Sequence, residues 1–151
     1  MTEQIKIELS EQFKKGRLNT SFFKDIQTMI DEDSNEELAL IFNFMQDIAN
    51  QKLLRGKNKP SWLNDNLETI PNTEFYETHN IWHYHCGPYA ESAKFNAMSK
   101  LKLNLNGETS SAVIHYQKIT DNHIFILAYS PKHEPFPKER DIPNPLLERL
   151  K

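Results

Sequence analysis

The sequence has little of several features that define protein classes. Its single cysteine, Cys86, excludes an intrachain disulfide and is typical of a protein from a reducing compartment. No apolar run approaches the roughly 20 residues that a membrane-spanning helix needs. Residues 1–9 lack the basic-then-apolar pattern of a signal peptide. We therefore expect a cytoplasmic protein without membrane contact. A chain of 151 residues is long enough to build a core without a metal or disulfide.

The chain also has no excess of positive charge. The chain carries 18 Lys and Arg against 21 Asp and Glu, a net charge of -3. This balance disfavours a protein that coats DNA or RNA by bulk electrostatics, and we expect no DNA binding by the chain itself. The charges are unevenly placed, however: residues 1–51 hold ten acids and five bases, whereas residues 52–59 hold four bases and no acid. This distribution indicates a local anion-binding site.

The first third of the chain has helical patterns after one short strand. Residues 5–9 alternate apolar and polar side chains, which predicts a half-buried strand. Ser10 is expected to begin a brief helix that ends at Gly16, and Thr20 or Ser21 to begin another. Ser34 and Glu37 form a capping-box signature before the strongest helix, which we expect to run to about Leu54 and stop at Gly56. Its predicted buried stripe is Leu38, Ile41, Phe42, Met45, Ile48, Ala49 and Leu53.

The second half of the chain has strand-like patterns. Runs of alternating or β-branched residues predict strands, and prolines and asparagines separate them. The expected strands are 80–86, 111–119 and 123–130, with 100–106 as a further candidate. The pattern predicts an α+β fold, with an N-terminal strand and helices packed on a mostly antiparallel sheet from the second half. We expect a single domain, 1–151, divided into 1–56 (mainly helical), 57–80 (irregular), 81–130 (sheet) and 131–151 (a proline-rich tail).

Four histidines are candidates for catalysis. In I-W-H-Y-H, His83 and His85 point to one side of a strand, because alternate residues share a face. His115 lies on the next predicted strand and His133 just after the third. Catalytic groups often lie at strand ends and in the loops that follow. We expect these rings to converge at one solvent-reachable place.

Histidine can accept and donate a proton near neutral pH, so it suits cleavage of RNA without a metal or other cofactor. Nearby cations would stabilise charge on the phosphoryl oxygens. The candidate cations are Arg55, Lys100, Lys102, Lys118 and Lys132. Tyr84 and Tyr116 are candidates to stack on an unpaired base, although Tyr84 also fits a core position. Cys86 is expected to be buried and inert.

The order of these motifs resembles a known family. R-G-K-N-K-P at 55–60 precedes H-Y-H at 83–85, H-Y at 115–116 and I-F-I-L-A-Y-S-P-K-H at 124–133. This order resembles the YafO-like toxins of bacterial type II toxin–antitoxin systems. The resemblance implies an α+β toxin of the RelE-like mRNA interferase group, which acts on mRNA with the ribosome and is inhibited by a cognate antitoxin protein. It places function on His83, His85, His115 with Tyr116, and His133.

Two other classes of function remain open from the sequence. His83 and His85, with His115 or His133, suit zinc or iron in a metal-dependent hydrolase, although Glu134 is the only carboxylate nearby in sequence. Alternatively, the chain is a non-catalytic interaction module of the immunity or antitoxin kind. In that case the acidic N-terminal half makes contacts and the histidines belong to the core.

Overall fold

The chain has an α+β fold, as predicted. A computed structural model describes residues 4–20, 22–89, 101–132 and 144–151. Its elements, in chain order, are β1 (Lys6–Leu9), α1 (Glu11–Lys15), α2 (Ile26–Asp31), α3 (Asn35–Ala49), β2 (Asn58–Pro60), α4 (Glu74–Thr78), β3 (Ile81–His85), β4 (Val113–Thr120), β5 (His123–Ser130) and the 3₁₀ helix η1 (Leu147–Arg149). None of the helices within the described ranges is long and apolar enough to cross a bilayer.

Five strands form one mixed sheet in the order β1-β5-β4-β3-β2. β1 pairs with β5 in parallel, and the other neighbours are antiparallel. A tight turn between Thr120 and His123 joins β4 to β5. The mostly antiparallel sheet of the second half is therefore confirmed, and the N-terminal strand extends it at one edge.

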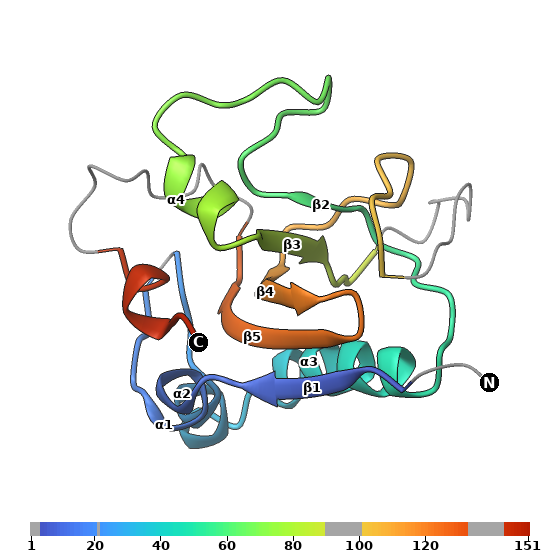
Figure 1. Ribbon diagram of the computed structural model, residues 1–151. Coiled ribbons are helices and arrows are strands. Elements are labelled where there is room, and N and C mark those ends of the chain that lie inside the picture. The colour runs from blue at the N-terminus through green and yellow to red at the C-terminus, as the bar shows by residue number, and fades with distance from the viewer. Residues whose placement is uncertain (1–3, 21, 90–100, 133–143) are drawn as a thin grey trace.

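Both faces of the sheet are covered. In Figure 1 the helices α1 to α3 lie below the strands β3 to β5, and α4 lies above them. On the α3 side, Phe44 and Ile48 pack in one core with Tyr84 and Tyr116. A second core, on the other side, contains Phe23, Phe75, Tyr76, Ile81, Leu127, Ala128 and Leu146. The sheet is thus an inner layer, with no open side in the region of β3 and β4.

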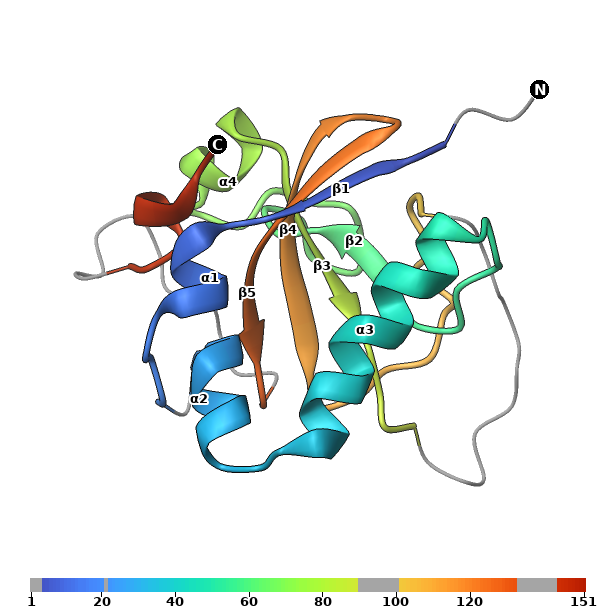
Figure 2. The ribbon, with the colours of Figure 1, turned by 90° about the horizontal axis from the view of Figure 1, so that it is seen from below.

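The strongest predicted helix exists, but its cap and its length differ from the prediction. Ser34 is the N-cap residue, but its side chain makes no capping bond: the Lys24 ammonium group donates to Ser34 Oγ at 3.3 Å and to Glu37 Oε1 at 2.6 Å. The helix ends at Ala49. Figure 2 shows that its axis runs obliquely across the strands. The backbone then turns at Gln51, whose φ is 57°.

The predicted stripe of α3 was partly wrong. Phe42 is 55% exposed, whereas Phe44, absent from the predicted stripe, is 2% exposed. Ile41, Phe44 and Ile48 face the sheet together, and their spacing of three and four residues defines the buried side of the helix. Leu53 lies beyond the helix and is half exposed.

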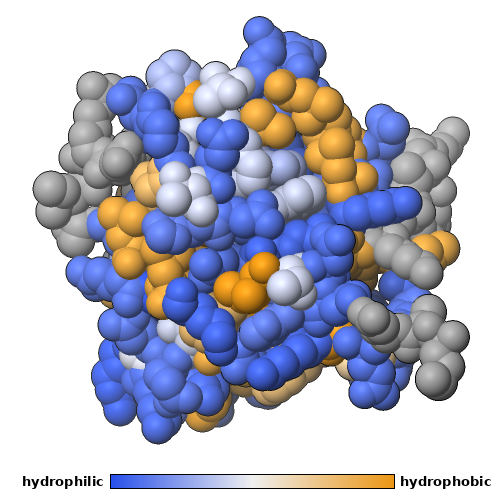
Figure 3. All heavy atoms as spheres, viewed as in Figure 1, coloured by the Kyte–Doolittle hydropathy of each residue, from blue (hydrophilic) through white to orange (hydrophobic). Residues whose placement is uncertain are grey.

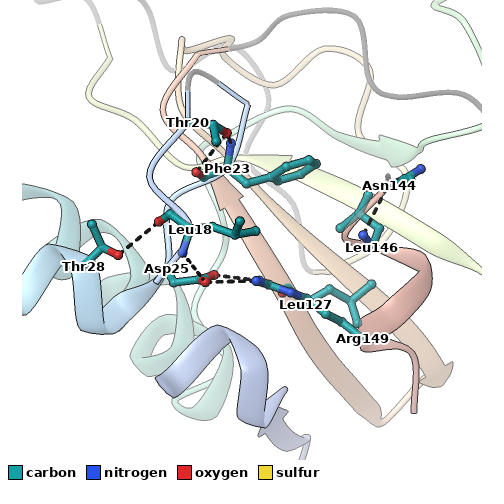
Figure 4. Close-up of polar contacts among 9 residues, drawn as sticks. All are labelled: Leu18, Thr20, Phe23, Asp25, Thr28, Leu127, Asn144, Leu146 and Arg149. Carbon is teal, nitrogen blue, oxygen red and sulfur yellow. Dashed lines mark hydrogen bonds and ion pairs between the residues drawn. The ribbon is translucent and has the colours of Figure 1, made fainter. Parts of the chain in front are cut away.

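The helix expected to begin at Thr20 or Ser21 begins instead at Ile26. Thr20 Oγ1 accepts hydrogen bonds from the backbone N–H groups of Phe22 and Phe23, at 3.2 and 3.0 Å, and so holds a turn. The Asp25 carboxylate accepts the N–H of Leu18 at 2.9 Å (Figure 4). These side-chain bonds hold Leu18, Phe22 and Phe23 outside a helix, and the helix begins after Asp25.

Two other segments also differ in detail from the prediction. Residues 57–80, predicted to be irregular, contain β2 and α4. Residues 101–106 form no strand; they contribute an isolated bridge in which Asn58 and Asn104 exchange backbone hydrogen bonds at 3.1 and 2.8 Å. The alternation of apolar and polar residues in this segment therefore does not correspond to a strand of the sheet.

Candidate functional site

Three of the four predicted catalytic histidines lie together. His83 on β3 is directly opposite His115 on β4, so the two side chains share one face of the sheet. The ring centroids of His83 and His85 are 5.7 Å apart. This face is the one opposite α3. The predicted convergence of these three rings is confirmed, whereas His133 lies outside the described residues.

Each of the three rings has one nitrogen held by a serine. The contacts are His83 Nδ1 to Ser61 Oγ at 3.0 Å, His115 Nε2 to Ser130 Oγ at 2.6 Å, and His85 Nδ1 to the backbone O and N of Ser110 at 3.0 and 3.2 Å. A hydrogen bond to one ring nitrogen fixes the orientation of the imidazole and leaves the role of the ring to its other nitrogen. We call His83, His85 and His115 the histidine cluster.

The expectation that the cluster is open to solvent was wrong. His83, His85 and His115 are 2%, 3% and 0% exposed. Phe23 packs edge-on against His115, with ring centroids 5.6 Å apart. The cause is the second core, which covers this face of the sheet with side chains from distant parts of the chain, including Tyr76 of α4. Access to the cluster therefore requires covering segments to move.

The two tyrosines predicted to stack on a base lie in the core on the opposite face. Tyr84 stacks on Phe44 with centroids 4.8 Å apart, and the Tyr116 hydroxyl donates to Asn58 Oδ1 at 2.8 Å. Burial raises the pKa of both phenols above the usual range. In this arrangement neither ring offers a face to a nucleotide, because alternation along each strand directs it away from the histidines.

The predicted cations are dispersed. Lys102 and Lys118 line a cavity on the α3 side of the sheet. Arg55 pairs with Glu108 at 2.9 Å and lies 4.7 Å from the centroid of the Tyr89 ring. Lys132 is exposed, two residues beyond the end of β5. Lys100 lies outside the described residues.

Two cations beside the histidine cluster were missed. Lys59 on β2 is directly opposite His83, so their side chains share a face, and the carbonyl of Lys57 accepts the N–H of His85 at 2.9 Å. The Lys57 and Lys59 ammonium groups lie 2.6 and 2.7 Å from one carboxylate oxygen of Asp65. These two lysines hold the pKa of Asp65 down to about 2. The alternation in K-N-K was the available signal, but residues 57–80 were predicted to be irregular.

The Asp65 side chain is the exposed member of this group. It is 65% exposed, whereas the lysine side chains are 11% and 12% exposed. Asp65 belongs to the segment between β2 and α4, and Figure 3 shows a largely hydrophilic face with separate apolar patches in this view. Leu67 in this segment is 47% exposed. The largely buried ammonium groups of Lys57 and Lys59 thus share the carboxylate of Asp65, which lies on a surface segment.

Cys86 is 7% exposed, as expected, and burial raises the pKa of its thiol to about 12. Among the described residues, no group of three His, Cys, Asp or Glu side chains is arranged to hold a metal ion.

Comparison of the chain with family models, curated proteins and solved structures gives no match. The likeness to YafO-like toxins therefore depends on the motifs alone.

Proposed function

We propose that this protein is a cytoplasmic toxin of a type II toxin–antitoxin system and cleaves mRNA, with the ribosome, by histidine acid/base catalysis. The observation that carries the proposal is the grouping of three imidazoles on one sheet face, with two largely buried lysines on the adjacent strand and the segment before it. Titratable rings and fixed positive charge are the groups that metal-free phosphodiester cleavage needs.

The chemistry follows from these groups. One imidazole of the cluster accepts the proton of the 2′-hydroxyl, whose oxygen attacks phosphorus. The bond from phosphorus to the 5′-oxygen breaks, and a second imidazole, protonated, donates a proton to that oxygen. The products are a 2′,3′-cyclic phosphate and a 5′-hydroxyl. Each proton transfer contributes about 10²–10⁴-fold to the rate.

Lys57 and Lys59 are the groups that would hold the phosphate. Their ammonium groups already share one anionic oxygen, that of Asp65. A phosphodiester carries the same single charge, so it can replace this carboxylate when the segment bearing Asp65 moves away. Such a movement also begins to open the face of the histidine cluster. This gating fits a substrate that arrives on a large partner such as the ribosome.

Induction in a strain without a matching antitoxin tests the proposal. The wild type is expected to arrest growth and shorten transcripts. His83→Asn, His85→Asn and His115→Asn each should reduce cleavage by about 10²-fold or more. His79→Asn, at the end of α4, is the matched control and should behave like the wild type.

Melting temperatures of the purified variants separate loss of fold from loss of catalysis. A folded His83→Asn protein without activity supports the proposal. Normal growth on induction of folded wild-type protein contradicts it and favours a non-catalytic interaction module.

A further inference from the structure

We infer a second ligand site, on the α3 side of the sheet, that binds a phosphate monoester of about nucleotide size. The site is a cavity of about 390 Å³ between the start of β1, the end of α3 and the β4–β5 turn. Figure 2 shows these three segments at the same end of the molecule. The histidine cluster lies on the opposite face, so this inference does not depend on the proposed nuclease.

The central group is Lys118. Its side chain is 11% exposed, and the nearest carboxylate oxygen among the described residues is Asp121 Oδ1, 4.0 Å away, on a side chain that is 97% exposed. The ammonium group lies 4.6 Å from the Trp82 ring centroid and 3.4 Å from the carbonyl oxygen of Leu101. These contacts orient the amine, but among the described residues they leave its charge without a carboxylate closer than that of Asp121.

Other lysines with equally buried side chains are paired differently. Lys24, 13% exposed, has carboxylates of Glu37 and Glu32 at 2.6 and 2.8 Å. Lys57, 11% exposed, has Asp65 at 2.6 Å. The pKa of Lys24 is raised, whereas desolvation lowers the pKa of Lys118. Burying an ammonium group is costly unless an anion compensates it, so a bound anion would stabilise Lys118 more than Lys24 or Lys57.

The charges of the cavity indicate what that anion is. Lys52 and Lys102 also line it, and Asp121 is the only acid among the described lining residues. Three positive charges and one negative leave a net charge of +2, which matches the near-dianionic charge of a phosphate monoester. Lysine ammonium groups bind phosphate as point charges.

The remaining lining residues indicate that the ligand has apolar faces in addition to its phosphate. Ile5, Ile48, Leu54 and Leu101 form the apolar wall. The volume lies within the range of about 300–1,000 Å³ of small-molecule sites. A nucleoside monophosphate combines a dianionic head with a flat base. The same chemistry occurs at the phosphorylated end of an RNA strand.

Titration with uridine 5′-monophosphate at low salt, followed by NMR or calorimetry, tests the site. Lys118→Met should weaken binding about tenfold or more, because it removes a charge-assisted contact. Lys15→Met removes an exposed charge from α1 and should leave affinity unchanged. Uridine should bind at least tenfold more weakly than the nucleotide.

A 5′-phosphorylated RNA trinucleotide and its 5′-hydroxyl form distinguish the two sources. Binding of the phosphorylated trinucleotide and the nucleotide alike assigns the site to an RNA end, whereas binding of the nucleotide alone assigns it to a free ligand. Failure of the nucleotide to bind, or equal weakening by Lys15→Met, overturns the inference.

Chemical labelling of the unmodified protein provides a second measurement. Pyridoxal 5′-phosphate supplies a phosphate and an aldehyde. The deprotonated fraction of the Lys118 amine adds to the aldehyde carbon, water leaves, and cyanoborohydride donates hydride to the protonated C=N bond to give a stable secondary amine. Peptide mapping should find Lys118 labelled first and protected by uridine 5′-monophosphate. Even labelling of surface lysines, without protection, contradicts the site.

Discussion

Replacing Arg149 with methionine should lower the melting temperature strongly, because it leaves the Asp25 carboxylate in the core without its cation. The two side chains form a bidentate pair, with Nη1 to Oδ1 at 2.7 Å and Nη2 to Oδ2 at 3.0 Å (Figure 4). Their side chains are 5% and 1% exposed. Arg149 Nη1 also donates to the carbonyl of Leu127 at 3.0 Å, which ties η1 to β5.

The magnitude follows from this burial. Removing one partner of a buried ion pair costs about 3–5 kcal/mol, and a chain of this size loses about 2–4 °C per kcal/mol, so the expected fall is roughly 6–20 °C. Methionine keeps much of the side-chain volume, so the loss reports charge and hydrogen bonding rather than a cavity. Thermal melts followed by circular dichroism, with urea unfolding for the free energy, measure it.

The matched control is Arg17→Met. Arg17 pairs with Asp31 at 2.8 Å, but these side chains are 75% and 48% exposed. An exposed pair contributes about 0–1 kcal/mol. If Arg149→Met destabilises the protein no more than Arg17→Met does, the reasoning from burial is refuted.

Three further measurements test other parts of the structure. The hydrogen bond to Lys57 is the main cause that lowers the pKa of Asp65 to about 2 in the fold. Asp65 therefore stabilises the fold above about pH 4, and this contribution is lost as the pH falls towards 2. In urea titrations, Asp65→Asn should reduce the fall in the free energy of unfolding between about pH 4 and pH 2. Tyr116→Phe should cost about 1–3 kcal/mol in urea unfolding, since Asn58 loses its buried donor. Cys86 should react with a thiol reagent near pH 8 far more slowly than in urea-unfolded protein; equal rates would contradict its burial.

Strand alternation is the part of the fold that the sequence predicted best. The strand expected at 123–130 has these bounds in the structure, and His83 and His115 share a face as expected. Period-two alternation gives the side to which a residue points but not what covers that side. The covering groups, such as Phe23 and Tyr76, are remote in sequence from the histidines. The burial of the histidine cluster could therefore not be predicted from the local sequence pattern.

The positive charges show the same limit. The long helix was expected to run to about Leu54, but α3 ends at Ala49, and the chain that follows leads into β2. Only the pairing of β2 with β3 places Lys59 beside His83. Helix boundaries depend on local competition for hydrogen bonds, and strand partners depend on contacts between remote segments, so neither follows from charge pattern.

The contacts that stabilise this fold also close the proposed catalytic face. Arg149 holds Asp25, Asp25 holds the backbone of Leu18, and the loop between Leu18 and Asp25 carries Phe23 over His115. Loosening the ion pair should therefore lower the melting temperature and, under the proposed function, raise RNA cleavage at temperatures where the variant stays folded. A cleavage rate that only follows the folded fraction would contradict this role of the ion pair.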